Sequence, residues 1–344
     1  MSALTMTATT MRAPAMIGLI AAALVLLALA GVGFGSTWIP LQDVVGVFLG
    51  GGERTQSLIV LQFRLPRVVA AALGGGAIAV AGYLLQKVTR NSLASPDILG
   101  VVDGAALGVV IFLAGLSDES NALTTSIAYQ PLAAGIGAAT ATALVFLLSG
   151  RQASSAIRLL LFGIAVAAVA KALTLVLMLI GPIYRTAQAT RWIAGAVNEV
   201  NWSEIQVTAI ALLPAMLLVL LVARKLAPTD LDETSARGVG LELPIFRIGI
   251  FILAAALTAI AVAFVGAIGF VGLMAPHLAR MTVGRNATAA IIASFLFGAL
   301  MLIGADLVVR VLFAPLEVPA GTVTAIIGTP YFLFLLMRKQ SHDG

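Results

Sequence analysis

The chain has 344 residues, of which 60% are hydrophobic and 10% charged, and its mean hydropathy is +1.08. A soluble domain carries about 25% charged residues, so the composition excludes a soluble protein and indicates a polytopic membrane protein. No cysteine and two histidines exclude disulfides, thiolate metal sites and a histidine metal cluster, so we predict neither a metal nor a cofactor. The net charge of +5 does not suggest nucleic acid as a partner.

Apolar segments recur along the whole chain, and roughly ten of them approach the 20 residues that a membrane span needs. They lie at 14–35, 67–87, 97–115, 130–149, 157–181, 205–223, 245–264, 268–280, 288–312 and 320–337. The first is long enough to be a retained span rather than a cleaved signal peptide. We therefore predict an all-α fold with about ten transmembrane helices in the lipid bilayer. It would have a cytoplasmic tail at 1–13, one transmembrane domain at 14–337 and a second cytoplasmic tail at 338–344.

The basic residues predict the orientation of these spans. With the N-terminus inside, the inside set is Arg12, Lys87, Arg90, Arg151, Arg158, Arg224, Lys225, Arg237, Arg247, Arg280, Arg285, Arg338 and Lys339. The outside set is smaller, and comprises Arg54, Arg64, Arg67, Arg185, Arg191 and Arg310. Since cytoplasmic loops carry the excess of lysine and arginine, we expect both termini to be cytoplasmic.

The largest inside loop, at about 224–244, contains the sequence Thr229 to Gly240 with acidic residues early, Arg237 late and a glycine behind it. This order is typical of a short capped helix. Such a loop is either a plain connection or a handle for a cytoplasmic partner, and the residues leave both open.

Several kinds of enzyme motif are missing from the chain. None of the four lysines follows a glycine, so there is no phosphate-binding loop, and any ATP must bind another subunit. There is no nucleophile elbow, no paired carboxylate site and no His-Glu-x-x-His helix. We predict that the chain is not an enzyme. Ionisable residues deep in apolar stretches are few, and comprise Asp103, Lys171 and Asp306.

The stretch 266–280 places Gly266, Gly269 and Gly272 at intervals of three residues, followed by Pro276 and His277. Small residues on one helical face allow close packing in lipid, and short apolar segments interrupted by glycine and proline occur at working parts of transporters. We expect a short helix with a role in packing or gating, in which His277 is a structural hydrogen-bonding residue. Ordinary tight packing is the alternative.

Six motifs in register resemble the permease subunits of ABC importers for iron-siderophore, haem and vitamin B12, which have the type II importer fold. They are Arg64-Leu-Pro-Arg67, the loop Thr89 to Gly100, Arg191-Trp-Ile-Ala-Gly195, Glu233 to Gly240, Gly266 to Arg280, and Gly304 to Arg310 followed by Glu317 to Gly328. Ser92 stands where the family usually has proline. The resemblance covers roughly residues 60–337.

The resemblance implies an importer of the bacterial cytoplasmic membrane. In it, two permease subunits form the pore, a cytoplasmic ABC ATPase dimer drives transport, and an extracytoplasmic binding protein delivers the ligand. A ferric siderophore is the expected ligand, with vitamin B12, haem or an oxyanion such as molybdate as alternatives. The second permease subunit is either an identical copy or a related chain. The alternatives from other functional classes are an ion-coupled secondary carrier and a structural membrane scaffold.

The resemblance also implies roles for single residues. Arg64, Arg67 and Arg310 match arginines that receive acidic residues of the binding protein, which suits bidentate guanidinium–carboxylate pairing. The alternative is that some of them anchor helix ends at lipid headgroups. The residues expected to contact the ATPase are Asp232, Glu233, Ser235, Ala236, Arg237 and Gly240. A solvated linker is the alternative for that segment.

The residues of the translocation path are predicted less directly than those of the docking and ATPase contacts. Lys171 lies deep in the fifth apolar segment, where a lone ammonium is costly, and Asp103 lies in the third. Lys171 either faces the pore and attracts an anionic chelate, pairs with Asp103, or extends to the interface.

Overall fold

The computed structural model describes residues 3–340 apart from residues 36, 119–121, 151–154, 182, 199, 232, 285, 315 and 317. Within these residues the chain is helical, and strand pairing is limited to one isolated bridge between Ser117 and Leu123. The predicted all-α class is therefore confirmed.

The N-terminal half forms four long helices and several short ones. In chain order they are α1 (Ala3–Gly33), α2 (Leu41–Phe48), α3 (Arg54–Leu58), the π-helical turn η1 (Ile59–Arg64), α4 (Leu65–Thr89), the 3₁₀ turn η2 (Pro96–Leu99), α5 (Val101–Gly115), the 3₁₀ turn η3 (Ile127–Tyr129) and α6 (Gln130–Ser149).

The C-terminal half continues in the same way. Its elements are α7 (Ala156–Ile180), α8 (Ile183–Ile193), α9 (Trp202–Val222), the 3₁₀ segment η5 (Ala223–Asp230), α10 (Glu233–Gly238), α11 (Leu243–Val265), α12 (Val271–Val283), α13 (Ala287–Leu312) and α14 (Ala320–Gln340).

Seven candidate spans in the described chain are long and apolar enough to cross a membrane, and they include α1, α4, α6, α7, α9, α11 and α13. α5 and the first part of α14 are apolar but shorter, and α12 has 13 residues. Each predicted segment thus contains a helix, but the count of about ten spanning helices is not confirmed. α5 follows the 3₁₀ turn η2, and α12 follows a non-helical turn at 266–270, so each begins late in its predicted segment.

Helix ends also differ from the predicted boundaries. α1 begins at Ala3 and α14 continues to Gln340, so helix extends into both segments that we predicted as tails. The apolar part of α1 starts only at Ala13, which is why composition placed the boundary there.

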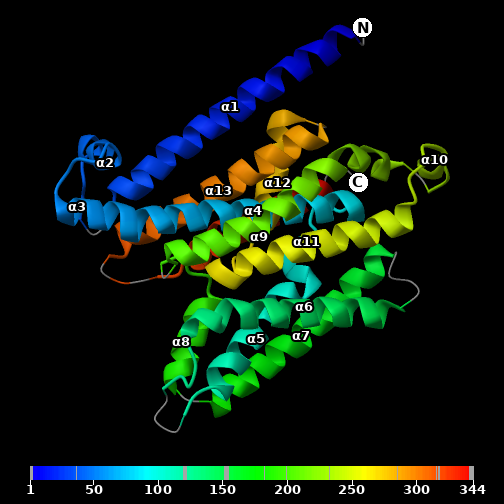
Figure 1. Cartoon of the computed structure of the whole chain (residues 1–344). Coiled ribbons are helices and arrows are strands. Elements are labelled where there is room, and N and C mark those ends of the chain that lie inside the picture. The colour runs from blue at the N-terminus through cyan, green and yellow to red at the C-terminus, as the bar shows by residue number, and fades with distance from the viewer. Residues whose placement is uncertain are drawn as a thin grey trace.

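α4 is the central helix of the molecule. It packs against α11, α12 and α13, and in Figure 1 it lies among these helices and α9. Its glycines allow this: a Cβ on Gly75 would lie 2.3 Å from the carbonyl oxygen of Gly298 in α13, and a Cβ on Gly298 would lie 2.2 Å from that of Gly75. Backbones therefore touch directly, as is common between helices in lipid.

A second group of helices consists of α5, α6 and α7, which pack on one another and join the first group through α11. Figure 1 shows this group with α8 below the layer of α4, α9 and α11. In the same view α10, the start of α1 and the C-terminus lie at one end of the molecule, and α2, α3 and α8 lie at the other. We call these the inner end and the outer end, after the predicted orientation.

Candidate functional site

The three arginines expected at the docking surface lie at the outer end, and two of them, Arg67 and Arg310, pair with one carboxylate. Arg67 reaches Oδ1 of Asp306 with Nε at 2.7 Å and Nη2 at 2.6 Å. Nε of Arg310 lies 3.0 Å from Oδ2 of Asp306, as an ion pair without well-directed hydrogen-bond geometry. Asp306 is buried, and it links α13 to α4. We call Arg64, Arg67, Asp306 and Arg310 the outer cluster.

The outer cluster also caps the end of α1, a role that sequence reasoning did not predict. Arg64 donates through Nη1 to the carbonyls of Val32 and Gly33, at 2.9 and 2.7 Å, and through Nη2 to the carbonyl and hydroxyl of Thr37. Arg310 donates to the carbonyl of Gly31 at 2.8 Å. The last carbonyls of a helix lack internal donors and carry partial negative charge, so guanidinium groups stabilise this end. Arg64 is consequently only 6% exposed.

At the inner end, α10 confirms the predicted short helix in the loop between α9 and α11. Ala236 is fully buried, and it packs in a small separate cluster with Leu241, Leu243 and Phe246. Ser235 is exposed, and Arg237 is exposed beside Glu242, with 3.4 Å between Nε and Oε2.

The other residues assigned to the ATPase contact are less fully described. Gly240 has a φ of +81°, a left-handed conformation that favours glycine. The backbone of Glu233 begins α10. Asp232 lies outside the described residues.

The stretch 266–280 does not form one glycine-lined helix, so that expectation is wrong. α11 ends at Val265, Gly266 turns with a φ of +71°, and α12 begins only at Val271. A Cβ on Gly266 would lie 2.3 Å from the carbonyl oxygen of Trp192, whereas one on Gly269 would meet Asp97 Oδ2 only at 3.8 Å. The three glycines therefore serve different purposes, because the positive φ and the chain turn interrupt the helical period.

Pro276 leaves one carbonyl of α12, that of Gly272, without its usual helical donor, and a side chain of α4 supplies a donor instead. Proline has no N–H, so Pro276 cannot donate to the carbonyl of Gly272 four residues earlier. Gln86 Nε2 donates to that carbonyl at 3.4 Å and to the carbonyl of Leu273 at 3.2 Å. A Cβ on Gly82 would lie 1.8 Å from the same Gly272 oxygen. Gln86 is buried and was not singled out by the sequence, since nothing in its spacing marks it.

The ring of His277 packs edge-on against Tyr331 of α14, with 6.0 Å between ring centroids and an interplanar angle of 74°. This contact joins α12 to α14. Among the described residues, no group of three or more histidine, cysteine, aspartate or glutamate side chains could hold a metal ion.

Lys171 and Asp103 lie on the neighbouring helices α7 and α5, which pack together. Lys171 is exposed and Asp103 half-buried, and the ammonium charge of Lys171 acts on the Asp103 carboxylate. The two charges are therefore electrostatically coupled across the α5–α7 contact.

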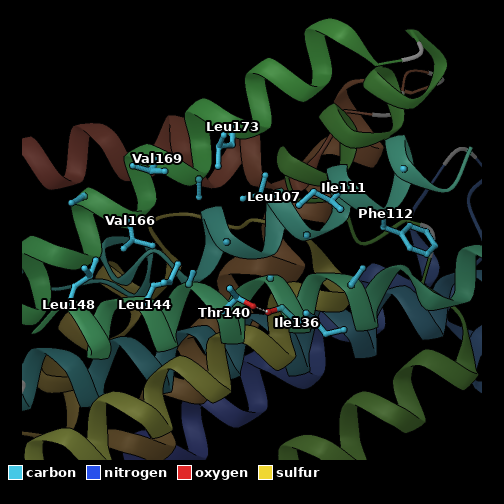
Figure 2. Close-up of a pocket in the computed structure, with 18 of the residues that line it drawn as sticks. Leu107, Ile111, Phe112, Ile136, Thr140, Leu144, Leu148, Val166, Val169 and Leu173 are labelled. Carbon is cyan, nitrogen blue, oxygen red and sulfur yellow. Dashed lines mark hydrogen bonds between the residues drawn. The ribbon is translucent and has the colours of Figure 1, made fainter. Parts of the chain in front are cut away.

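An apolar hollow of about 710 Å³ lies between α5, α6 and α7. Figure 2 shows its apolar walls, with side chains such as Leu107, Ile136, Leu144 and Leu173. The hydroxyl of Thr140 in this wall donates to the carbonyl of Ile136 in its own helix. A charged chelate would lose its hydration here without gaining partners, so this hollow is not a candidate site for one.

Comparison with known proteins gives a consistent picture. Residues 22–338 match the model of the FecCD transport family. YfhA of Bacillus subtilis (strain 168), assigned as a siderophore transport system permease protein, is 42% identical over 326 residues, which are 95% of this chain and 94% of that protein. The achromobactin transport system permease protein CbrC of Dickeya dadantii (strain 3937) is 39% identical over 311 residues, covering 90% and 88%. The hemin transport system permease protein HmuU of Yersinia pestis is 36% identical over 284 residues, covering 82% and 84%.

A solved structure supports the fold as well. A chain assigned to a metal-chelate type ABC transporter, in an inward-facing conformation, aligns with a TM-score of 0.84 at 28% identity, over 94% of this chain and 99% of that chain. The family match covers most of the chain, and the relatives match nearly end to end. This chain is a permease of the FecCD transport family.

Proposed function

We propose that the chain forms half of the translocation pathway of an ATP-driven importer for a ferric siderophore. The support comes from relatives whose names include siderophore and achromobactin transport, and from a structural neighbour of the metal-chelate type. Haem stands as the second substrate class, because HmuU is named for hemin transport. The importer would lie in the bacterial cytoplasmic membrane, with both termini and α10 on the cytoplasmic side.

The observation that carries the proposal is the construction of α10. A short helix with exposed Ser235 and Arg237, followed by exposed Val239, is held from beneath by the buried side chain of Ala236. A helix fixed in this way can pass on a displacement, which a solvated linker cannot. This supports a contact with a cytoplasmic ATPase dimer, made by the segment from Asp232 to Gly240.

The outer cluster supports docking of an acidic binding protein. Asp306 pairs with Arg67 and Arg310, and Arg64 adds a third guanidinium, so the four side chains sum to a net charge of +2. Arg67 is the most exposed of the three arginines, at 17% of its side chain. Acidic residues of a docked protein would meet this excess charge at Arg67 first, and Arg64 and Arg310 would act mainly through their charge.

Changing Arg67 to Gln tests the docking surface. We expect weaker capture of the binding protein in a pull-down, with the difference shrinking at high salt because screening removes the charge effect. Exposed Arg54, also near the outer end, provides a matched Arg54→Gln control. Equal capture by both variants and the wild type would rule out docking at this cluster.

Gating would involve α12. Close contact of Gly272 with α4 and of His277 with α14 supports movement of α12 as one body with its neighbours, while Gly266 and Gly269 belong to the turn before it. A second permease subunit, identical or related, would complete the pore. Lys171 and Asp103 are the charged residues that we place near the ligand path.

The decisive experiment is reconstituted uptake of a radiolabelled ferric siderophore. We expect uptake that requires the ATPase, the binding protein and ATP and that vanadate inhibits. Uptake that persists without any ATPase would identify an ion-coupled carrier instead. Hemin in place of the siderophore distinguishes the two substrate classes.

A further inference from the structure

The loop that follows α4 begins with a residue in an unusual conformation. Arg90 has a φ of +52°, in the left-handed region that costs a residue with a Cβ about 1 kcal/mol. This turn directs its guanidinium toward the segment before α10. Nε and Nη2 donate to the carbonyl of Thr229 at 2.9 and 2.8 Å, and Nη2 also donates to the carbonyl of Leu231. One side chain therefore holds two backbone carbonyls in a fixed fork.

A second contact from α4 reaches the same segment. Lys87 forms an ion pair with Asp230, which lies between the two carbonyls that Arg90 holds. Thr229 itself is buried, and its hydroxyl donates to the carbonyl of Leu226 at 2.6 Å. The turn that precedes α10 is thus attached to the end of α4 rather than free in solvent.

The loop that carries Arg90 is itself ordered. The amide of Leu93 donates to Oδ1 of Asn91 at 3.0 Å, and the amide of Ala94 donates to the carbonyl of Asn91 at 3.1 Å. Ala94 and Ser95 are buried. A turn closed by its own asparagine, with buried residues behind it, moves as a unit.

The far end of this loop touches the start of α12. The carboxylate of Asp97 lies beside the turn before α12, since a Cβ on Gly269 would be 3.8 Å from its Oδ2, and it accepts a hydrogen bond from the hydroxyl of Ser95 at 3.2 Å. Cδ of Pro96 is 2.7 Å from the position that a Cβ on Gly272 would take. Residues 90–97 therefore contact the α10 segment at one end and the start of α12 at the other.

We propose that Arg90 is a positioning residue for coupling, and that residues 90–97 transmit displacement of α10 to the start of α12. This inference rests on the proposed function, because displacement of α10 requires an ATPase beneath it. Transmission needs contacts that are continuous and stiff, and the fork of Arg90, the Asn91 turn and the close approach of Pro96 to Gly272 supply them in sequence.

Two readouts on the full-length permease test this. The chain has no cysteine, so Ser235→Cys provides a single site for a spin label on α10. The second readout is uptake per ATP hydrolysed, in proteoliposomes with the ATPase and the binding protein. Arg90→Ala should increase label mobility and lower uptake per ATP several-fold. Arg224→Ala, which changes an exposed arginine of η5, is the matched control and should leave both unchanged.

A further variant tests the end of the loop at Asp97 independently of the end at Arg90. Asp97→Ala removes the carboxylate that lies beside the Gly269 turn and accepts from Ser95, and should lower uptake per ATP while label mobility on α10 stays as in the wild type. If Arg90→Ala does not purify as a folded protein, Arg90→Gln, which keeps one donor without the charge or the fork, takes its place.

Wild-type mobility and wild-type coupling in the Arg90 variant would overturn the assignment of Arg90. Normal coupling in Asp97→Ala would overturn transmission to α12. Uptake by wild-type vesicles without ATPase would instead refute the proposed function, and the mobility measurement would still test whether Arg90 holds α10.

Discussion

Gln86 of α4 donates its side-chain amide to the carbonyl of Gly272 in α12, the oxygen that Pro276 leaves without a helical donor. A buried carbonyl without a partner is costly, so the proline in α12 and the glutamine in α4 depend on each other.

This dependence predicts non-additive stabilities. Gln86→Met keeps the size of the side chain but removes the donor, and should lower the free energy of unfolding by about 1–3 kcal/mol. In a Pro276→Ala background the new N–H of residue 276 can donate to Gly272, so the same change should cost clearly less. Thermal unfolding in detergent of the wild type, both single variants and the double variant measures this coupling. Equal costs in the two backgrounds would contradict it.

Gly82 and Gly269 should respond differently to an added methyl group. Gly82→Ala would place a Cβ 1.8 Å from the Gly272 oxygen, so α4 and α12 must separate, at a cost of about 1–3 kcal/mol or more. Gly269→Ala meets its first neighbour at 3.8 Å and has no positive φ, so we expect little change. Unfolding temperatures of the two variants check this, and a larger loss for Gly269→Ala would show that the described packing is wrong.

The carboxylate of Asp306 balances the charges of Arg67 and Arg310. Asp306→Asn leaves these buried cations without a counter-charge, and breaking a buried pair costs about 3–5 kcal/mol. We expect loss of stability together with loosening of α1, whose last carbonyls Arg64 and Arg310 hold. Limited proteolysis near Thr37 reports on α1, and Glu53→Gln, at an exposed acidic residue near the outer end, serves as the control. Unchanged proteolysis and stability in Asp306→Asn would argue against the cap.

Ala236 supports α10 from below. Ala236→Leu overpacks the contact with Leu241, Leu243 and Phe246, which should tilt α10 and lower uptake per ATP, while the transmembrane part stays folded. Ala227→Leu makes the same change at an exposed alanine of η5, outside the proposed ATPase contact, so its coupling should match the wild type. If the two variants behaved alike, the position of α10 would not matter for coupling.

Lys171 provides a test of the ligand path. Lys171→Met removes a positive charge from the exposed side of α7 but keeps most of the aliphatic length, so uptake of an anionic chelate should fall several-fold while assembly is unchanged. Initial uptake rates measure this, with Lys225→Met, at an exposed lysine of η5, as the control. Wild-type uptake in Lys171→Met would place this lysine outside the path.

The sequence by itself determined the membrane class, the location of a helix in every apolar segment and the family, because hydropathy and local motifs are properties of neighbouring residues. The pair of Asp306 and Arg310 is also a local feature, since residues four apart meet on a helix. The sequence did not predict that the chain turns at Gly266 after α11. Glycines spaced three residues apart fit one face of a helix as well as they fit a turn.

Only the tertiary structure decided which distant groups meet. Arg64 lies 31 residues from Gly33, Gln86 186 residues from Gly272, and Arg90 139 residues from Thr229. Each pairing joins a side chain to a backbone carbonyl, and carbonyls are the same in every residue, so no sequence pattern marks the partner. Two of the arginines expected on a docking face, Arg64 and Arg310, hold α1, because helix packing brought its last carbonyls within their reach.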